Sequence, residues 1–194
     1  MNPATHILLS WSAAGSIAIN RRERFLITMA GVIPDIDGAG LLFDFFHKDQ
    51  SQPFLIWSKY HHILCHNIGF FLFLLICAAL LSTKRLMTCG LVFITFHLHL
   101  ICDIAGSKGP DGEQWEIPYL LPFSDTWQLT WAHQWELNAW PNVVITVFAI
   151  FLTLFIAWKK GISPVEFFSG KANSLFVKTL RDRFGEPENR QEIL

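Results

Sequence analysis

The chain has 194 residues, of which 52% are hydrophobic and 16% are charged, and its formal net charge at pH 7 is −1. This length suits one domain or one small bundle, and the near-zero charge creates no field that would attract nucleic acid. Charged residues make up about a quarter of a typical soluble domain, so the apolar excess indicates a membrane protein surrounded by lipid. We therefore expect membrane lipids, and no nucleic acid, as partners.

Four apolar segments follow one another along the chain, at residues 4–19, 63–83, 86–105 and 142–158. The second and third approach the roughly 20 residues that a spanning helix needs, and the fourth is slightly short. The first contains Ser, Gly and Ala, and it could span the membrane, lie at its surface or pack in a core. The pattern predicts an all-α fold, a small membrane bundle of about four apolar helices over residues 1–160.

Clusters of cations come directly after the first, second and fourth apolar segments, at residues 21–24, 84–85 and 159–160. Under the positive-inside rule these clusters face the cytoplasm, which predicts a multi-pass membrane protein. The histidine-bearing ends of the segments would then share the extracytoplasmic face. Lys48 and Lys59 lie in a loop assigned to the outside, contrary to the rule.

The connection 106–141 is rich in tryptophan and is expected to form a loop. Two interpretations stay open, an aromatic belt at the headgroup level and a lid that grips an amphipathic substrate. Its tryptophans are Trp115, Trp127, Trp131, Trp135 and Trp140.

The tail at 161–194 is polar and forms the second predicted unit of the chain. The spacing of Leu175, Phe176, Leu180 and Phe184 predicts a short amphipathic helix on the cytoplasmic side.

The four cysteines lie singly in apolar sequence, without a C-x-x-C motif. They are predicted to be buried free thiols and to form neither disulfides nor a thiolate zinc site. They are Cys65, Cys77, Cys89 and Cys102.

The segment H-L-H-L-I-C-D at 97–103 places polar groups inside an apolar run. His99 and Asp103 are four residues apart and would share one helix face, where an imidazole and a carboxylate can bind one divalent metal. Left unpaired in an apolar setting, they would be costly. His97 would point elsewhere and is expected to be a packed or interfacial histidine.

A second cluster, K-Y-H-H-I-L-C-H-N at 59–67, contains three histidines. Helical spacing pairs His62 with His66 on one face. If the helix begins only near residue 63, His61 lies in the approach loop and is free to turn inward.

The P-D-I-D-G turn at 34–38 and His6 complete the candidate set. Asp35 and Asp37 lie two residues apart, after a proline that would end a helix. They could be metal-binding carboxylates or part of an ordinary helix-capping turn. His6 stands at the head of the first apolar segment. Nitrogen and oxygen donors of this kind suit zinc or manganese, and their number suggests two or more ions, an arrangement used in phosphoester hydrolysis.

The ordered motifs T-H (5–6), P-D-I-D (34–37), H-H-I-L-C-H (61–66) and H-L-I-C-D (99–103), followed by L-L-P-F-S-D, resemble a known family. It comprises the LexA-binding, inner-membrane-associated hydrolases, also described as YdjM-like membrane-bound metal-dependent hydrolases. The resemblance covers about residues 1–160. The family is similar to zinc-dependent phospholipase C and nuclease P1, which are all-helical proteins with clustered metals.

The resemblance implies a metal-dependent hydrolase of phosphoesters, with phospholipids among the candidate substrates. The family pattern His-Arg-x-x-Thr-His aligns with residues 61–66, which implies His61 and His66 as ligands, with His62 in the place of Arg and Cys65 in the place of Thr. This differs from the pairing that helical spacing favours, so His62 is held in reserve. The implied ligands, for one to three ions of zinc or manganese, are His6, Asp35, Asp37, His61, His66, His99 and Asp103.

Two further roles are assigned by position. Asp35 or Asp37, if not fully engaged with metal, would be the general base. His133 and Glu136, three apart on a predicted helix, could complete a second metal site, although an interfacial surface pair is the favoured explanation.

Two alternatives remain to the hydrolase hypothesis. One is a non-enzymatic membrane protein whose metal site braces the bundle while a regulatory protein partner binds elsewhere. The other is a haem-binding bundle with His66 and His97 as axial ligands, which leaves the P-D-I-D turn and Asp103 unexplained.

Overall fold

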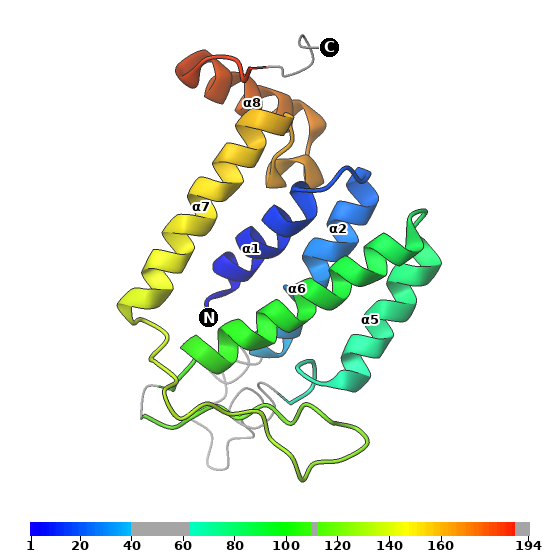
Figure 1. The fold of residues 1–194 in the computed structure, drawn as a ribbon, viewed down its shortest axis with the longest axis vertical. Coiled ribbons are helices and arrows are strands. Elements are labelled where there is room, and N and C mark those ends of the chain that lie inside the picture. Colours follow the sequence, from blue (N-terminus) through cyan, green and yellow to red (C-terminus); the bar gives the residue numbers. More distant parts are fainter. Residues whose placement is uncertain (40–62, 110–111, 189–194) are drawn as a thin grey trace, which may run out of the picture.

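The computed structural model describes residues 1–39, 63–109 and 112–188. Within these ranges there is no strand beyond isolated bridges, and the all-α prediction is confirmed for the described residues (Figure 1). Short 3-10 helices are η1 (Ile33–Ala39) and η2 (Pro164–Phe167). The α-helices are α1 (Pro3–Gly15), α2 (Arg21–Ala30), α5 (Ile68–Leu81), α6 (Arg85–Gly106), α7 (Trp140–Lys160) and α8 (Gly170–Phe184).

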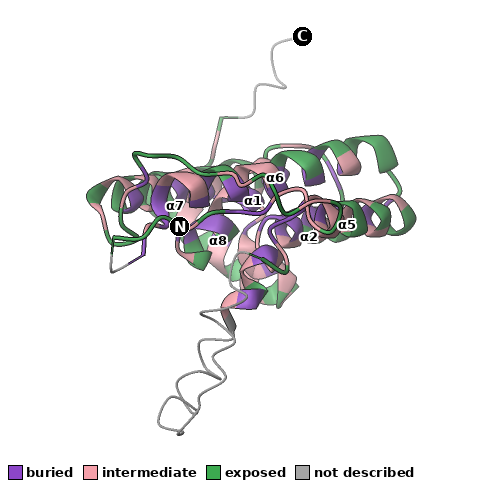
Figure 2. Cartoon of the chain, turned by 90° about the horizontal axis from the view of Figure 1, so that it is seen from below, coloured by how far each residue is buried: buried purple, intermediate pink, exposed green. Residues whose placement is uncertain are grey.

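Helix α1 lies in the middle of the bundle. It packs against α7 on one side and against α2 and α6 on the other, while α5 packs on α6 (Figure 1). Seen from the end where the chain starts, buried residues gather around α1, and the outer faces of α5 and α6 are exposed (Figure 2). Large apolar side chains such as Phe73, Phe93 and Phe151 are exposed on α5, α6 and α7, as expected of helices that face lipid.

Helix boundaries follow from local capping. The Asn2 side chain accepts a hydrogen bond from the Thr5 amide, and Pro3 follows at the first helical position. Asn20 forms a capping box with Glu23 at the start of α2, and Asn67 caps α5. Helix α7 ends at Gly161, whose φ of 72° is in the left-handed region that glycine adopts without strain.

Two described helices, α6 and α7, are long and apolar enough to cross a membrane, so the expectation of about four apolar helices is not supported. The segment 63–83 becomes helical only at Ile68, because Asn67 caps the helix there. The 14 residues of α5 span about 21 Å. Helix α1 is a packed helix with polar contacts: Thr5 and Ser12 form hydrogen bonds with Thr146 and Thr153 of α7. These contacts place α1 inside the protein.

The bundle has two chemically different ends. At one end, the Lys84 ammonium donates to the Ala18 carbonyl, Arg21 donates to the Phe167 carbonyl, and Glu23 accepts from the Thr83 and Lys84 amides. This end therefore gathers the end of α1, the start of α2, the α5–α6 turn and η2. The opposite end carries the starts of α1, α5 and α7 and the ends of α2 and α6 (Figure 1). The division of the chain at residue 160 stays a prediction.

Candidate metal centre

Four side chains from three elements converge at the end of the bundle where the chain starts. His6 comes from α1, Asp35 from η1, and His99 and Asp103 from α6. One nitrogen or carboxylate oxygen from each lies within 4.8 Å of the corresponding atom of every other. His6, His99 and Asp103 are buried, and Asp35 is partly exposed.

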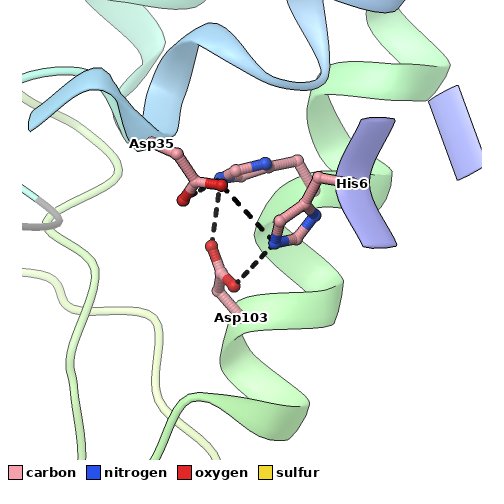
Figure 3. A group of neighbouring side chains, drawn as sticks. His6, Asp35 and Asp103 are labelled. Atoms are coloured by element: carbon pink, nitrogen blue, oxygen red, sulfur yellow. Dashed lines mark hydrogen bonds and ion pairs between the residues drawn. The ribbon is translucent and has the colours of Figure 1, made fainter. Parts of the chain in front are cut away.

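Both imidazoles turn Nε2 toward the two carboxylates. His6 Nε2 lies 3.1 Å from Asp103 Oδ1 and 4.0 Å from Asp35 Oδ2 (Figure 3). His99 Nε2 lies 3.0 Å from Asp103 Oδ2 and 3.7 Å from Asp35 Oδ1. The contact between His99 and Asp103 is the one that their spacing of four residues on a helix predicts.

The end of α2 fixes the orientation of His99. The Nδ1–H of His99 donates to the Gly31 carbonyl at 3.1 Å. In the neutral His99 ring the lone pair is therefore on Nε2, which faces the carboxylates. Gly31 itself is in close contact with α1, because a Cβ atom there would lie 2.0 Å from Ser10 Oγ. Glycine thus lets α2, α1 and α6 meet directly behind the site.

His66 and Asp37 form a second layer beside the four donors. His66 Nδ1–H donates to Asp37 Oδ2 at 3.1 Å, and its Nε2 lies 3.0 Å from His99 Nε2 and 3.5 Å from Asp103 Oδ2. Burial alone would lower the pKa of His66, but hydrogen bonds with Asp103 and Asp37, together with their charges, raise it to about 9.

Asp103 has the largest number of contacts in the cluster. The Met1 ammonium donates to its Oδ1 and to Ser107 Oγ, and Ser107 Oγ also donates to Oδ1 at 2.9 Å. Positive charge is thus already drawn to this carboxylate, as expected where two carboxylates are enclosed by protein.

The residues present fit a divalent cation. Two imidazole nitrogens and two carboxylates form a donor set that zinc and manganese both accept, and it does not distinguish between them. Asp35 Oδ2 is buried and has no hydrogen-bond partner among the described residues, which a bound cation would satisfy.

Several predicted site residues lie elsewhere. His61 and His62 fall outside the described residues. His97 is on another face of α6, as predicted; its Nδ1–H donates to the Phe93 carbonyl, and its Nε2 accepts from the Tyr119 hydroxyl at 2.8 Å. Neither nitrogen is available to haem iron. The expected helix around His133 and Glu136 is wrong, because 131–139 forms turns and a bridge, and both side chains are exposed away from the four donors.

The loop before α7 contributes residues that no sequence motif marks. Gln134 is buried; its side-chain amide donates to the Asp103 carbonyl, and its oxygen accepts from the Trp115 amide. The Trp135 amide donates to the Ala105 carbonyl, and its indole donates to Asn142. The loop is therefore attached to the end of α6 that carries Asp103.

The cysteines take no part in the four-donor group. All four are free, but only Cys102 is buried, while Cys65, Cys77 and Cys89 are partly buried. Burial, and then the charge of Asp37, raise the pKa of Cys65 to about 11, which keeps it a thiol.

Comparison with known families then places the chain. The YdjM inner membrane protein family matches residues 1–176. The chain belongs to this family. Membership of the YdjM family, together with the two candidate spans α6 and α7, supports a location in the inner membrane. No curated protein and no solved structure matches this YdjM family member, and the expected similarity to zinc-dependent phospholipase C and nuclease P1 finds no support.

Proposed function

We propose that this chain is a metal-dependent hydrolase of the inner membrane that cleaves a phosphoester, with phospholipids as the leading substrate class. The observation that carries the proposal is the convergence of four buried or half-buried donors, His6, Asp35, His99 and Asp103, within 4.8 Å. Separate elements bring these donors together, and enclosed carboxylates oppose folding unless positive charge balances them; the Met1 ammonium contributes part of that charge, and a divalent cation would add the rest.

The four donors would hold the cation, and the second layer would orient them. A divalent cation supplies positive charge that polarises a phosphoryl oxygen and lowers the pKa of a bound water toward neutrality. Asp37 Oδ2 accepts a hydrogen bond from His66 Nδ1, so Asp37 would position that imidazole. This engagement leaves Asp35 as the better of the two candidate bases.

Asp35 also lies on the accessible side of the cluster. Its side chain is 13% exposed, against 1% or less for the side chains of His6, His99 and Asp103. An Asp35 carboxylate oxygen that does not bind the cation can accept a proton from water or orient it. Substrate would approach from this side.

Charge distribution supports an extracytoplasmic position for the site, with α6 and α7 both crossing the membrane. The exposed cations of the opposite end, Arg21, Arg22, Lys84, Arg85, Lys159 and Lys160, mark that end as cytoplasmic under the positive-inside rule. At the site end, Phe123, Trp127, Trp131 and Trp140 are exposed. Side chains of this kind favour the headgroup region, which would bring phospholipid phosphoesters to the site.

A structural metal site is the second candidate, favoured by the burial of His6, His99 and Asp103. A four-donor site that is closed to water would brace α1 against α6 and η1 without catalysis, leaving function to a protein partner. Among the four donors, the partial exposure of Asp35 is what favours a coordination position open to water.

Activity after metal replacement tests the proposal. Purified protein is stripped with a chelator, reloaded with zinc or manganese, and assayed on a generic phosphodiester and on phospholipid vesicles. We expect hydrolysis that requires metal, is lost in His99→Ala, and is retained in the control His133→Ala, whose imidazole is exposed and is not among the four donors. Stoichiometric metal without hydrolysis of either substrate would favour the structural site instead.

A further inference from the structure

A second surface lies at the cation-rich end, where α8 follows α7. Gly161 ends α7, η2 follows, and α8 lies across the end of α7 (Figure 1). The Arg181 side chain donates to the Trp158 carbonyl, the Trp158 indole donates to the Gly185 carbonyl, and Val177 is buried. One face of α8 is thus held against the end of a candidate membrane span.

A different face of α8 is apolar and open. Ala172, Leu175, Phe176, Thr179 and Leu180 follow the spacing of one helical stripe, and Val177 lies on another side. With Val165 of η2, this stripe lines a groove of about 360 Å³. Leu175 in the groove is 67% exposed, and Phe168 and Phe184 on either side of the stripe are 89% and 73% exposed. Such apolar exposure in a cluster marks an interaction surface.

Cations flank the stripe. Lys171 and Lys178 are exposed and seven residues apart, so they lie on one side of α8, directly beside the apolar stripe. On the same helix Arg183 is exposed, as is Asp182 four residues after Lys178, and at the end of α7 Lys159 and Lys160 are exposed as well. An apolar stripe bordered by lysines is the pattern of helices that lie in the membrane surface.

We propose that this α8 surface, consisting of the groove residues with Lys171 and Lys178, binds anionic phospholipid at the membrane surface. Two observations select lipid as the occupant. Helix α8 is held at the end of a candidate membrane span, and the exposed cations on or beside the stripe, Lys171, Lys178 and Arg183, outnumber the one exposed carboxylate of α8, Asp182. The apolar side chains would enter the headgroup–acyl boundary while the lysines reach the phosphates. The surface is at the opposite end from the metal centre and does not depend on it.

Amide hydrogen exchange in nanodiscs tests this surface. Full-length protein, one copy per disc, is placed in phosphatidylcholine alone or mixed with phosphatidylglycerol. We expect the amides of residues 170–184 to exchange on the order of tenfold more slowly with phosphatidylglycerol, as the attraction of two lysines to an anionic surface implies. The double variant Lys171→Gln/Lys178→Gln should lose this difference.

A matched pair of variants tests the apolar stripe. Leu175→Gln should speed exchange in α8 in both lipids, while Ser174→Gln, its exposed neighbour on the far side of the helix, should leave exchange unchanged. Both positions are exposed, so neither change should unfold the bundle. Equal exchange of the wild-type helix in the two lipids would overturn the proposal. Slow exchange found only with two or more copies per disc would also overturn it, in favour of a second copy of the chain.

Discussion

At the residue scale, His99 and His66 each divide their two ring nitrogens between different partners. The Nδ1–H of His99 donates to the Gly31 carbonyl, and the Nδ1–H of His66 donates to Asp37. Both rings therefore point Nε2 toward the cluster. This arrangement, in which an outer acceptor orients an inner ligand, is common at metal sites. Under the proposed function, Asp37 would position His66 and Asp103 would contact the cation directly.

The two aspartates should therefore differ when changed. Asp103→Asn removes a charge from the four-donor cluster, and metal affinity should fall by more than about 100-fold, whereas Asp37→Asn should lower it only about 10- to 100-fold. Competition titration against a chelating dye measures both affinities. Equal losses in the two variants, with unchanged helix content, would place Asp37 among the direct ligands.

Residue spacing predicted the contact within one helix, but it could not predict the contacts between segments that are far apart in the sequence. The contact between His99 and Asp103 is local to one helix, so a repeat of four residues was sufficient to pair them. The meeting of His6 with Asp103 joins positions 97 residues apart and depends on how α1 packs against α6. Gln134 is brought to the site by a loop, and its sequence context carries no signal of that contact.

At the element scale, the end of α2 controls how closely α1, α2 and α6 pack behind the site. Gly31→Ala would set a methyl group against Ser10 Oγ, so we expect a loss of stability of about 1–3 kcal/mol and weaker metal binding, because the Gly31 carbonyl orients His99.

A second substitution separates crowding from other effects. Removing the opposing hydroxymethyl group in Gly31→Ala/Ser10→Gly should recover much of the lost stability, as measured by thermal unfolding with and without metal. No recovery in the double variant would contradict the assigned contact.

Glu23 joins two elements at the cation-rich end and should make stability depend on pH. Burial alone would raise the pKa of Glu23, but hydrogen bonds from Thr83, Lys84 and Asn20 hold it below the ordinary value of 4.5. Ionised Glu23 thus stabilises the fold above about pH 4.5, and this contribution is lost as the pH falls through the lower folded-state pKa.

Thermal unfolding across acidic pH measures this contribution. Glu23→Gln should be less stable than the wild type at pH 7, and the difference should shrink as the pH falls below 4.5. A difference that stays constant down to pH 3 would show that the charge of Glu23 does not matter.

Element boundaries show where sequence patterns stop being informative. The apolar run 63–83 predicted one helix, yet Asn67 caps the chain and α5 starts only at Ile68. Around His133 and Glu136, helical spacing was misleading, because the backbone of Trp135 bonds to Ala105 and Lys108 at the end of α6 instead of forming helical hydrogen bonds. Tertiary contacts decided both cases.

At the scale of the whole molecule, the two ends differ in charge and chemistry. One end carries the imidazole–carboxylate cluster and exposed tryptophans, and the other carries exposed cations and α8. This polarity was predicted from cation clusters alone, and the helix directions place those clusters together (Figure 1). The expectation of about four apolar helices is not supported, because two described helices, α6 and α7, are long and apolar enough to span; α1, whose role the sequence left open, is a packed helix.

Accessibility in intact cells tests the proposed orientation. Cysteines introduced at Glu113, at the site end, and at Lys178, on α8, are both at exposed positions. A membrane-impermeant maleimide should label Glu113→Cys in spheroplasts and Lys178→Cys only after lysis. The reverse pattern would place the site in the cytoplasm.

The central claim is that His6, Asp35, His99 and Asp103 hold a divalent cation, and elemental analysis of the purified full-length protein tests it most directly. The account predicts at least one equivalent of zinc or manganese per chain in the wild type, retained in His133→Ala and lost in folded His99→Ala and Asp103→Asn proteins. A folded wild-type protein that binds neither metal after incubation with either would contradict it.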